Sequence, residues 1–143
     1  MSENRKYNLP LAELIDKVTI NQIKQVKQKN DDNFKDEINK ICHDISYIIQ
    51  KKKLKLNADI LLYTITIAQI NLHIWHNKDE MQKNLHNEKD YLQLLKFAHQ
   101  LNGIRNSIKN KILQLEGEDT ISNIRSNFET DNLNMDLGLD KIK

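Results

Sequence analysis

The chain is poor in the residues that turn or cross-link a polypeptide. Its 143 residues include three glycines, one proline and one cysteine. So few glycines and prolines leave little material for the turns of a many-stranded sheet, and long helices joined by short polar loops are expected instead. A single cysteine excludes a disulfide within the chain and a metal site built from cysteines alone, and it fits a reducing compartment.

Long apolar runs are also missing. No stretch reaches the roughly 18 apolar residues that a membrane-spanning helix needs. The first ten residues, MSENRKYNLP, are polar and lack the pattern of a signal peptide. We therefore expect a cytoplasmic protein with no membrane span. The net charge is only +2, and the basic run at 51–55 contains no aromatic residue, so nucleic-acid binding is not expected.

Four segments have the apolar spacing of helices. They are expected at 10–29 (with Asn8 as a candidate cap), from Phe34 into the basic run at 51–55, after the capping residue Asn57, and at 88–116 before Gly117. Short loops make consecutive helices antiparallel. The sequence therefore predicts an all-α, up-down four-helix bundle at 9–116. Residues 117–143 hold three basic and six acidic residues and lose the helical spacing, which predicts an acidic, mostly disordered tail.

The third helix is apolar almost all round, although its β-branched residues at 64–67 also fit a strand. One side carries Leu61, Leu62, Ile65, Ala68, Leu72 and Trp75, and the other carries Ile60, Ile67, Ile70 and Ile74. A helix of this kind is either central in its own bundle or shared with a second subunit. We expect it to be the most buried element and the protein to be a homo-oligomer. The candidate interface residues are Ile67, Ile70, Ile74 and Trp75.

Arg105 occupies a position in the fourth helix where an apolar residue is expected. The helical seam, at alternating steps of four and three, consists of Leu94, Ala98, Leu101, Arg105, Ile108, Ile112 and Leu115. A guanidinium is almost never fully buried unless it is paired. Arg105 therefore either forms a salt bridge with a buried carboxylate or binds an anionic ligand. Candidate acids are Glu13 and Asp16, with Asp44 and Glu80 in reserve.

The neighbours of Arg105 bear on both alternatives. Asn102, Asn106 and Lys109 share its helical stripe, and two amides with two cations form a plausible anion site. In the salt-bridge alternative, Asn106 and Lys109 face water instead.

Metal and catalytic signals are weak elsewhere. Glu13 and Asp16 have the three-residue spacing of helical metal ligands, but they are a lone pair. The five histidines form neither HExxH nor Glu-x-x-His. Cys42 lies on the apolar side of its helix, where a thiol serves for packing. We therefore expect no metal and no cofactor, we assign no catalytic residue, and whether the protein is an enzyme stays open.

Two stretches resemble known proteins. Glu13-Leu-Ile-Asp16-Lys17-Val-Thr19-Ile20 resembles the first helix of small uncharacterised helical proteins of bacteria and their phages. Asn71 to His76, followed by Leu101-Asn102-Gly103-Ile-Arg105-Asn106, resembles a related group, some of whose members are encoded near glycan-assembly genes. The resemblance implies no activity. It singles out Glu13, Asp16, Asn71, Trp75, Asn102, Arg105 and Asn106.

Two functions fit these observations. The first is a non-catalytic helical binding or assembly protein that forms homo-oligomers. The alternative is an enzyme or binding domain for a phosphorylated or carboxylated small molecule. In that case the candidate ligand-binding residues are Glu13, Asp16, Asn71, Asn102, Arg105, Asn106 and Lys109.

Overall fold

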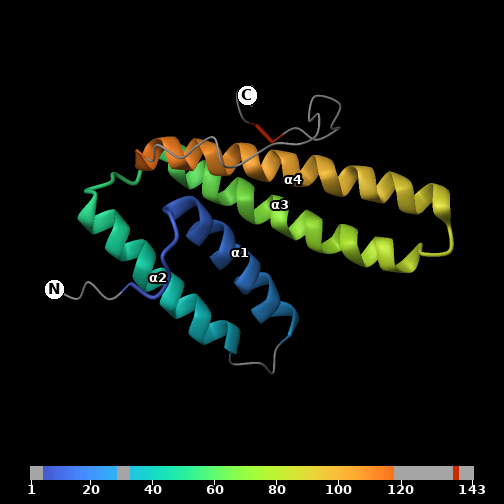
Figure 1. The fold of residues 1–143 in the computed structure, drawn as a ribbon, viewed down its shortest axis with the longest axis horizontal. Helices are drawn as coiled ribbons and strands as arrows, with labels where there is room; N and C mark the ends of the chain where they lie inside the picture. Colours follow the sequence, from blue (N-terminus) through green and yellow to red (C-terminus); the bar gives the residue numbers. More distant parts are fainter. Residues whose placement is uncertain (1–4, 29–32, 118–136, 139–143) are drawn as a thin grey trace.

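The computed structural model describes residues 5–28, 33–117 and 137–138. These residues form four α-helices and no strand. The helices are α1 (Leu11–Lys27), α2 (Asn33–Lys51), α3 (Ala58–Lys83) and α4 (Glu88–Glu116). The predicted all-α bundle is therefore confirmed, and the segment with strand-like residues is helical (Figure 1).

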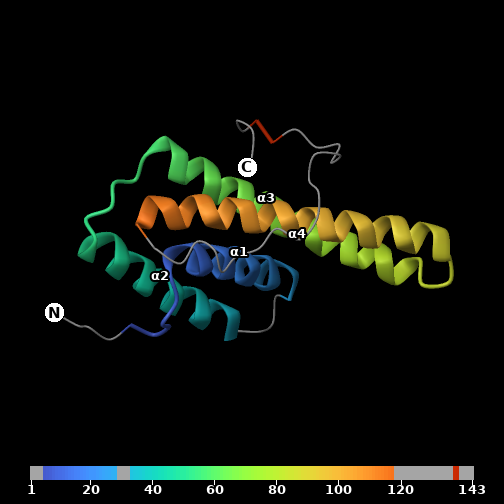
Figure 2. The same ribbon diagram turned by 45° about the horizontal axis from the view of Figure 1, so that its top comes forward.

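The helices are arranged as two antiparallel hairpins. The longer hairpin is α3 with α4, and the shorter hairpin, α1 with α2, lies against one of its sides (Figures 1 and 2). α1 packs against each of the other three helices, whereas α2 has only α1 as a neighbouring helix. The central helix is therefore α1, and the two hairpins meet along it.

The core lies mainly where α1, α3 and α4 meet. Its fully buried large side chains include Leu11 and Leu14 from α1, Ile67 and Ile70 from α3, and Leu101, Ile108 and Ile112 from α4. Each such side chain contributes about 1.5–3 kcal/mol through burial. α2 adds Ile41 and Ile48. The buried strip of α2 is narrow because it faces one helix only, and Cys42, which was expected to pack, is exposed.

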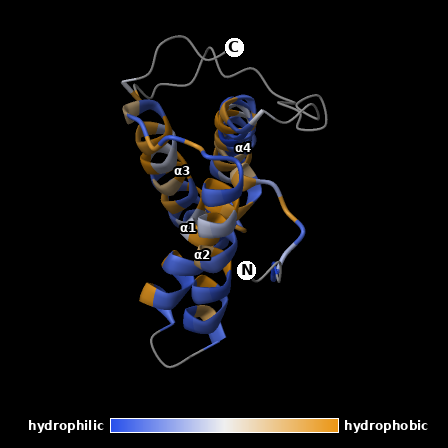
Figure 3. Cartoon of the chain, turned by 90° about the vertical axis from the view of Figure 1, so that its left-hand side faces the viewer, coloured by the Kyte–Doolittle hydropathy of each residue, from blue (hydrophilic) through white to orange (hydrophobic). Residues whose placement is uncertain are grey.

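α3 buries only one of its two apolar sides. Ile67 and Ile70 are inaccessible to water and Ile74 is 8% exposed, so these three candidate interface residues belong to the chain's own core. The opposite side is open, with Leu61 55% and Ile65 58% exposed. The expectation that α3 is the most buried helix was wrong, because no helix of the described chain covers that side. Figure 3 shows apolar segments along α3.

The helix ends follow local chemistry. The Asn57 side chain accepts a hydrogen bond from Ile60 N at 3.0 Å, as its predicted capping role requires. α2 ends earlier than expected, because Lys53 adopts a positive φ of 53° and Leu54 N bonds back to Ile49 O. This pattern closes a helix and usually has glycine at the left-handed position. α1 ends at Lys27, and its N-cap is Pro10 rather than Asn8.

Two segments outside the helices join the fold. Asp44, fully buried in α2, accepts hydrogen bonds from Lys6 N at 2.7 Å and Tyr7 N at 2.6 Å, which fixes the chain that leads into α1. Leu137 packs against the hydrophobic core. The rest of the predicted acidic tail, 118–136 and 139–143, lies outside the described residues. None of the helices in the described ranges is long and apolar enough to cross a membrane.

Candidate functional site

A buried polar cluster lies where α1, α3 and α4 meet, close to the position that the sequence singled out. Its members are Glu13, Asp16 and Thr19 from α1, Asn71 from α3, and Arg105 and Lys109 from α4. Asp16, Thr19, Asn71 and Lys109 are all less than a tenth exposed. Polar groups this deeply buried need partners, because an unmade hydrogen bond costs about 1–3 kcal/mol.

The side chain of Asn71 hydrogen-bonds to members of the cluster on both neighbouring helices. Its amide nitrogen donates to Asp16 Oδ1 at 2.9 Å and to Thr19 Oγ1 at 2.7 Å. Its amide oxygen accepts from Arg105 Nη1 at 3.2 Å. An asparagine amide has two donors and one acceptor oxygen, so a single side chain links all three helices.

Lys109 takes the place that Arg105 was expected to fill. Its ammonium lies 3.1 Å from Glu13 Oε1 and 3.4 Å from Asp16 Oδ2. Among the described residues, Arg105 forms no ion pair with a carboxylate, and its Nε is buried without a hydrogen-bond partner. The predicted Arg105–carboxylate pair is therefore wrong, although the acids, Glu13 and Asp16, were correctly placed.

The buried face of α4 is broader than the predicted seam. Leu101, Ile108 and Ile112 of that seam are buried, while Leu115 is 40% exposed. Lys109, one turn after Arg105, is buried as well, and Arg105 itself is half-buried. The reserve acids are engaged elsewhere: Asp44 holds the N-terminal segment, and Glu80 pairs with Lys83 at 3.2 Å.

The charges of the cluster are balanced. It contains the two carboxylates of Glu13 and Asp16 and the two cations Lys109 and Arg105. The ammonium of Lys109 lies between the carboxylates, so it takes the place that a metal cation would need. In the described part of the chain, no three His, Cys, Asp or Glu side chains gather where they could hold a metal. The geometry suits a clamp between helices.

The remaining predicted ligand-binding residues lie at the margin. Asn102 and Asn106 are half-buried on α4. Asn102 makes no hydrogen bond to the cluster within the described ranges. The structure therefore brings together Glu13, Asp16, Asn71, Arg105 and Lys109, and it leaves Asn102 outside.

The sequence reasoning missed a second buried acid, Glu116. Its Oε1 accepts from Leu11 N at 2.7 Å, and its Oε2 lies 2.7 Å from Lys52 Nζ. An acid in the last turn of a helix opposes the helix dipole, and that anomaly is the signal that could have identified it. Glu116 instead satisfies the first amide of α1, because the ring of Pro10 carries no hydrogen-bond acceptor that could cap the helix.

Asp44, a reserve partner for Arg105 in the sequence analysis, also carries a signal of its own. It lies three residues after Ile41 and four before Ile48, so it shares the buried stripe of α2. Tyr7, which Asp44 holds in place, has a pKa above its ordinary value, because burial disfavours the phenolate and the Glu37 carboxylate repels it.

Comparison with family models, curated proteins and solved structures finds no match for this chain. The resemblance to small helical proteins of bacteria and phages therefore stays a prediction.

Proposed function

We propose that this protein is a non-catalytic helical assembly protein that self-associates through the open side of α3. The observation that carries the proposal is a second helical seam on that side, the outer seam, made of Leu61, Ile65, Ala68, Leu72 and Trp75. Its steps of four and three are the spacing by which one helix packs along another. Leu61 and Ile65 are more than half exposed, and large apolar patches on a protein surface mark interaction sites.

A second copy of α3 is the partner that the chemistry favours. From Ile60 to Asn77 the helix has no Asp, Glu, Lys or Arg, in a chain of which 29% is charged. Two such helices meet without burying an unpaired formal charge. In a two-fold dimer the same patch serves both subunits, so the outer seam needs no complementary surface elsewhere.

Further apolar side chains are exposed at the end of the long hairpin where α3 begins and α4 ends. Leu115 of α4 is 40% exposed and lines a small cavity together with Asn57 and Ile60. Leu56 and Leu62 are 62% and 39% exposed. Additional apolar area at the same end adds to the stabilisation that self-association would give, at about 25 cal/mol per Å² removed from water.

The non-catalytic part of the proposal rests on the polar cluster. Its donors and acceptors are engaged mainly with one another, so the alternative of an anionic ligand held at Arg105 has less support. Among the described members of the cluster, the buried side-chain atom without a hydrogen-bond partner is the Arg105 Nε. We also propose a cytoplasmic location, supported by the exposed free thiol of Cys42, which persists most readily in a reducing compartment. We likewise propose a bacterial or phage origin, which is supported by the resemblance of two stretches to small helical proteins of bacteria and phages.

Self-association can be measured by sedimentation velocity and light scattering between about 1 and 100 μM, a range typical of modest dimer affinities. Dimers are expected to form within this range. The only tryptophan, Trp75, lies in the outer seam, so its fluorescence should change with dilution. The double variant Leu61→Glu/Ile65→Glu should remain folded and monomeric, because each glutamate places a charge in the seam.

The matched control is Val26→Glu on α1, where the side chain is 61% exposed and outside the seam. This variant should associate like the unmodified protein. A wild-type chain that stays monomeric up to 100 μM would refute the proposal, as would dimers that persist in the double variant.

A further inference from the structure

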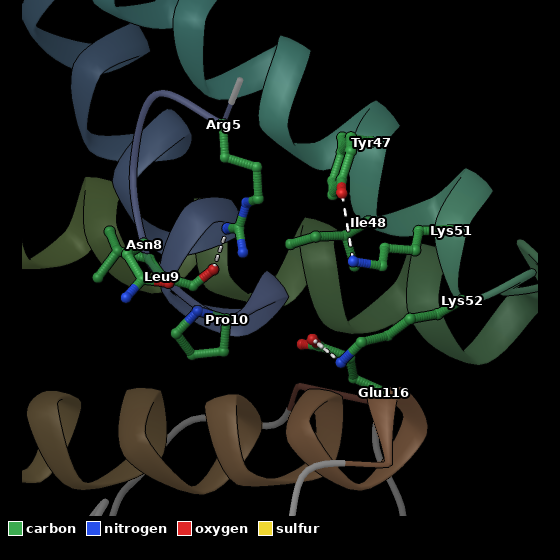
Figure 4. A pocket seen from close by; sticks show the side chains of 9 residues that line it. All are labelled: Arg5, Asn8, Leu9, Pro10, Tyr47, Ile48, Lys51, Lys52 and Glu116. Carbon is green, nitrogen blue, oxygen red and sulfur yellow. Dashed lines mark hydrogen bonds and ion pairs between the residues drawn. The ribbon is translucent and has the colours of Figure 1, made fainter. Parts of the chain in front are cut away.

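A second candidate site lies at the N-terminal end of α1, beside the ends of α2 and α4. A cavity of about 350 Å³ is lined by Arg5, Asn8, Leu9, Pro10, Tyr47, Ile48, Lys51, Lys52 and Glu116. These residues come from the N-terminal segment, the last turn of α2 with the residue after it, and the end of α4 (Figure 4). The volume is in the range of small-molecule sites in proteins.

The lining carries an excess of positive charge. It contains three cations, Arg5, Lys51 and Lys52, against one carboxylate, Glu116. That carboxylate is only 2% exposed, and both of its oxygens are engaged by Leu11 N and Lys52 Nζ. A ligand entering the cavity would therefore meet a wall whose negative charge is already neutralised.

Two of the cations keep hydrogen-bonding capacity. Arg5 Nη2 donates a hydrogen bond to Leu9 O, but the ion pair of Arg5 with Asp44 is long, at 3.9 Å, and Arg5 Nε is buried without a hydrogen-bond partner. Lys51 Nζ lies 3.3 Å from Tyr47 Oη and 5.4 Å from the centre of the same ring. Within the described ranges Lys51 pairs with no carboxylate, and the carboxylate paired with Arg5 is Asp44, at 3.9 Å. In Figure 4, Arg5 and Lys51 approach the cavity from different segments.

Apolar groups form the rest of the wall. Leu9, Pro10 and Ile48 line the cavity beside the cations, and Tyr47 adds an aromatic ring. Such a mixture suits a molecule with a strongly anionic end and a small organic body. Arginine and lysine are the side chains that bind phosphate best, the first through a fork and the second as a point charge.

We propose that this cavity binds a small phosphorylated metabolite, with the phosphate held by Arg5 and Lys51 and the organic body against Pro10, Ile48 and Tyr47. The site is distinct from the cluster around Arg105, because no residue of that cluster lines the cavity. It does not depend on self-association through α3, because no residue of the outer seam lines it either.

The probes are ribose 5-phosphate, ribose and inorganic phosphate, titrated into the full chain and followed by calorimetry and by thermal shift. Ribose 5-phosphate should bind saturably, with a dissociation constant below about 1 mM. Inorganic phosphate should bind more weakly and ribose should not bind. Equal affinity for phosphate and ribose 5-phosphate would overturn the role of the apolar wall.

Variants assign the phosphate contacts. Arg5→Gln and Lys51→Gln should each weaken binding of ribose 5-phosphate about tenfold, the loss expected for one charge-assisted hydrogen bond. Both should keep the helical circular-dichroism signal of the unmodified chain. Lys83→Gln is the matched control, because Lys83 is 71% exposed at the end of α3, and it should bind normally. The proposal would be overturned if ribose 5-phosphate showed no saturable binding up to about 10 mM, the practical limit for weak sites. Equal binding of ribose 5-phosphate by Arg5→Gln, Lys51→Gln and Lys83→Gln would also overturn it.

Discussion

At the scale of single residues, Asn71 does more to join the helices than any charged residue. Its side chain forms three hydrogen bonds, with Asp16 and Thr19 on α1 and with Arg105 on α4. The ion pairs of Lys109 link only α4 to α1. A neutral amide thus connects the acidic and basic halves of the cluster, and it also links α3 to α1 and α4.

Replacing Asn71 by leucine should therefore destabilise the protein strongly. The variant Asn71→Leu leaves Asp16 Oδ1 and Arg105 Nη1 without their buried partner, at about 1–3 kcal/mol for each group. We expect the free energy of unfolding in urea to fall by about 3 kcal/mol. Asn39→Leu, at an exposed position of α2, should change it by less than about 0.5 kcal/mol. Equal effects of the two variants would contradict the central role of Asn71.

The cluster shows how far a sequence can identify buried polar residues. Three members of the cluster could be predicted, because they interrupt apolar stripes or lie in the stretches that resemble other helical proteins: Glu13, Asp16 and Asn71. The choice between Arg105 and Lys109 could not be predicted, because the two cations lie one turn apart on the same stripe of α4. Only packing against α1 and α3 decides which of them meets the two acids.

At the scale of elements, the segment from Arg5 to Pro10 has no regular structure and is fixed by one buried carboxylate. Asp44 accepts from the amides of Lys6 and Tyr7, and Leu9 and Tyr7 pack on the core. Hydrogen bonds to an ionised acceptor are the stronger kind. The position of this segment therefore depends on α2, far along the sequence.

Asp44→Ala should release this segment. Amide hydrogen exchange at Lys6 and Tyr7 should become at least tenfold faster, and the free energy of unfolding should fall by about 2–3 kcal/mol. Asp36→Ala is the control, because the Asp36–Lys40 pair is exposed and such pairs contribute about 0–1 kcal/mol. Unchanged exchange at Lys6 in Asp44→Ala would show that apolar packing alone holds the segment.

The positions of the helices could be predicted from the sequence, but the faces by which they pack against one another could not. The cap Asn57 is a local signal and functions as predicted; Asn87, which was not predicted as a cap, caps α4 in the same way. The two apolar sides of α3 were also visible in the sequence. Which side faces the core could not be predicted, because both sides carry large aliphatic residues at helical spacing. The difference arises only when α1 and α4 cover Ile67 and Ile70.

At the scale of the whole molecule, the two hairpins are joined unequally. α1 contacts all three other helices and contributes Leu11, Leu14 and Ile15 to the core. α2 packs against α1 alone, and its only residues below a tenth exposure in the described chain are Ile41, Asp44 and Ile48. Regions with few buried apolar contacts open at a lower free energy than the global unfolding reaction.

α2 should therefore be the first helix to open. In the unmodified protein, the amides between Ile41 and Ile48 should exchange at least tenfold faster than those between Ile67 and Ile74 in α3. Amides around Ile15 in α1 should exchange as slowly as those of α3, because α1 remains packed on the long hairpin when α2 opens. Hydrogen exchange followed by nuclear magnetic resonance resolves these amides individually. Equal rates in α2 and α3 would mean that the four helices unfold as one unit, while fast exchange around Ile15 would make the α1–α2 hairpin the opening unit.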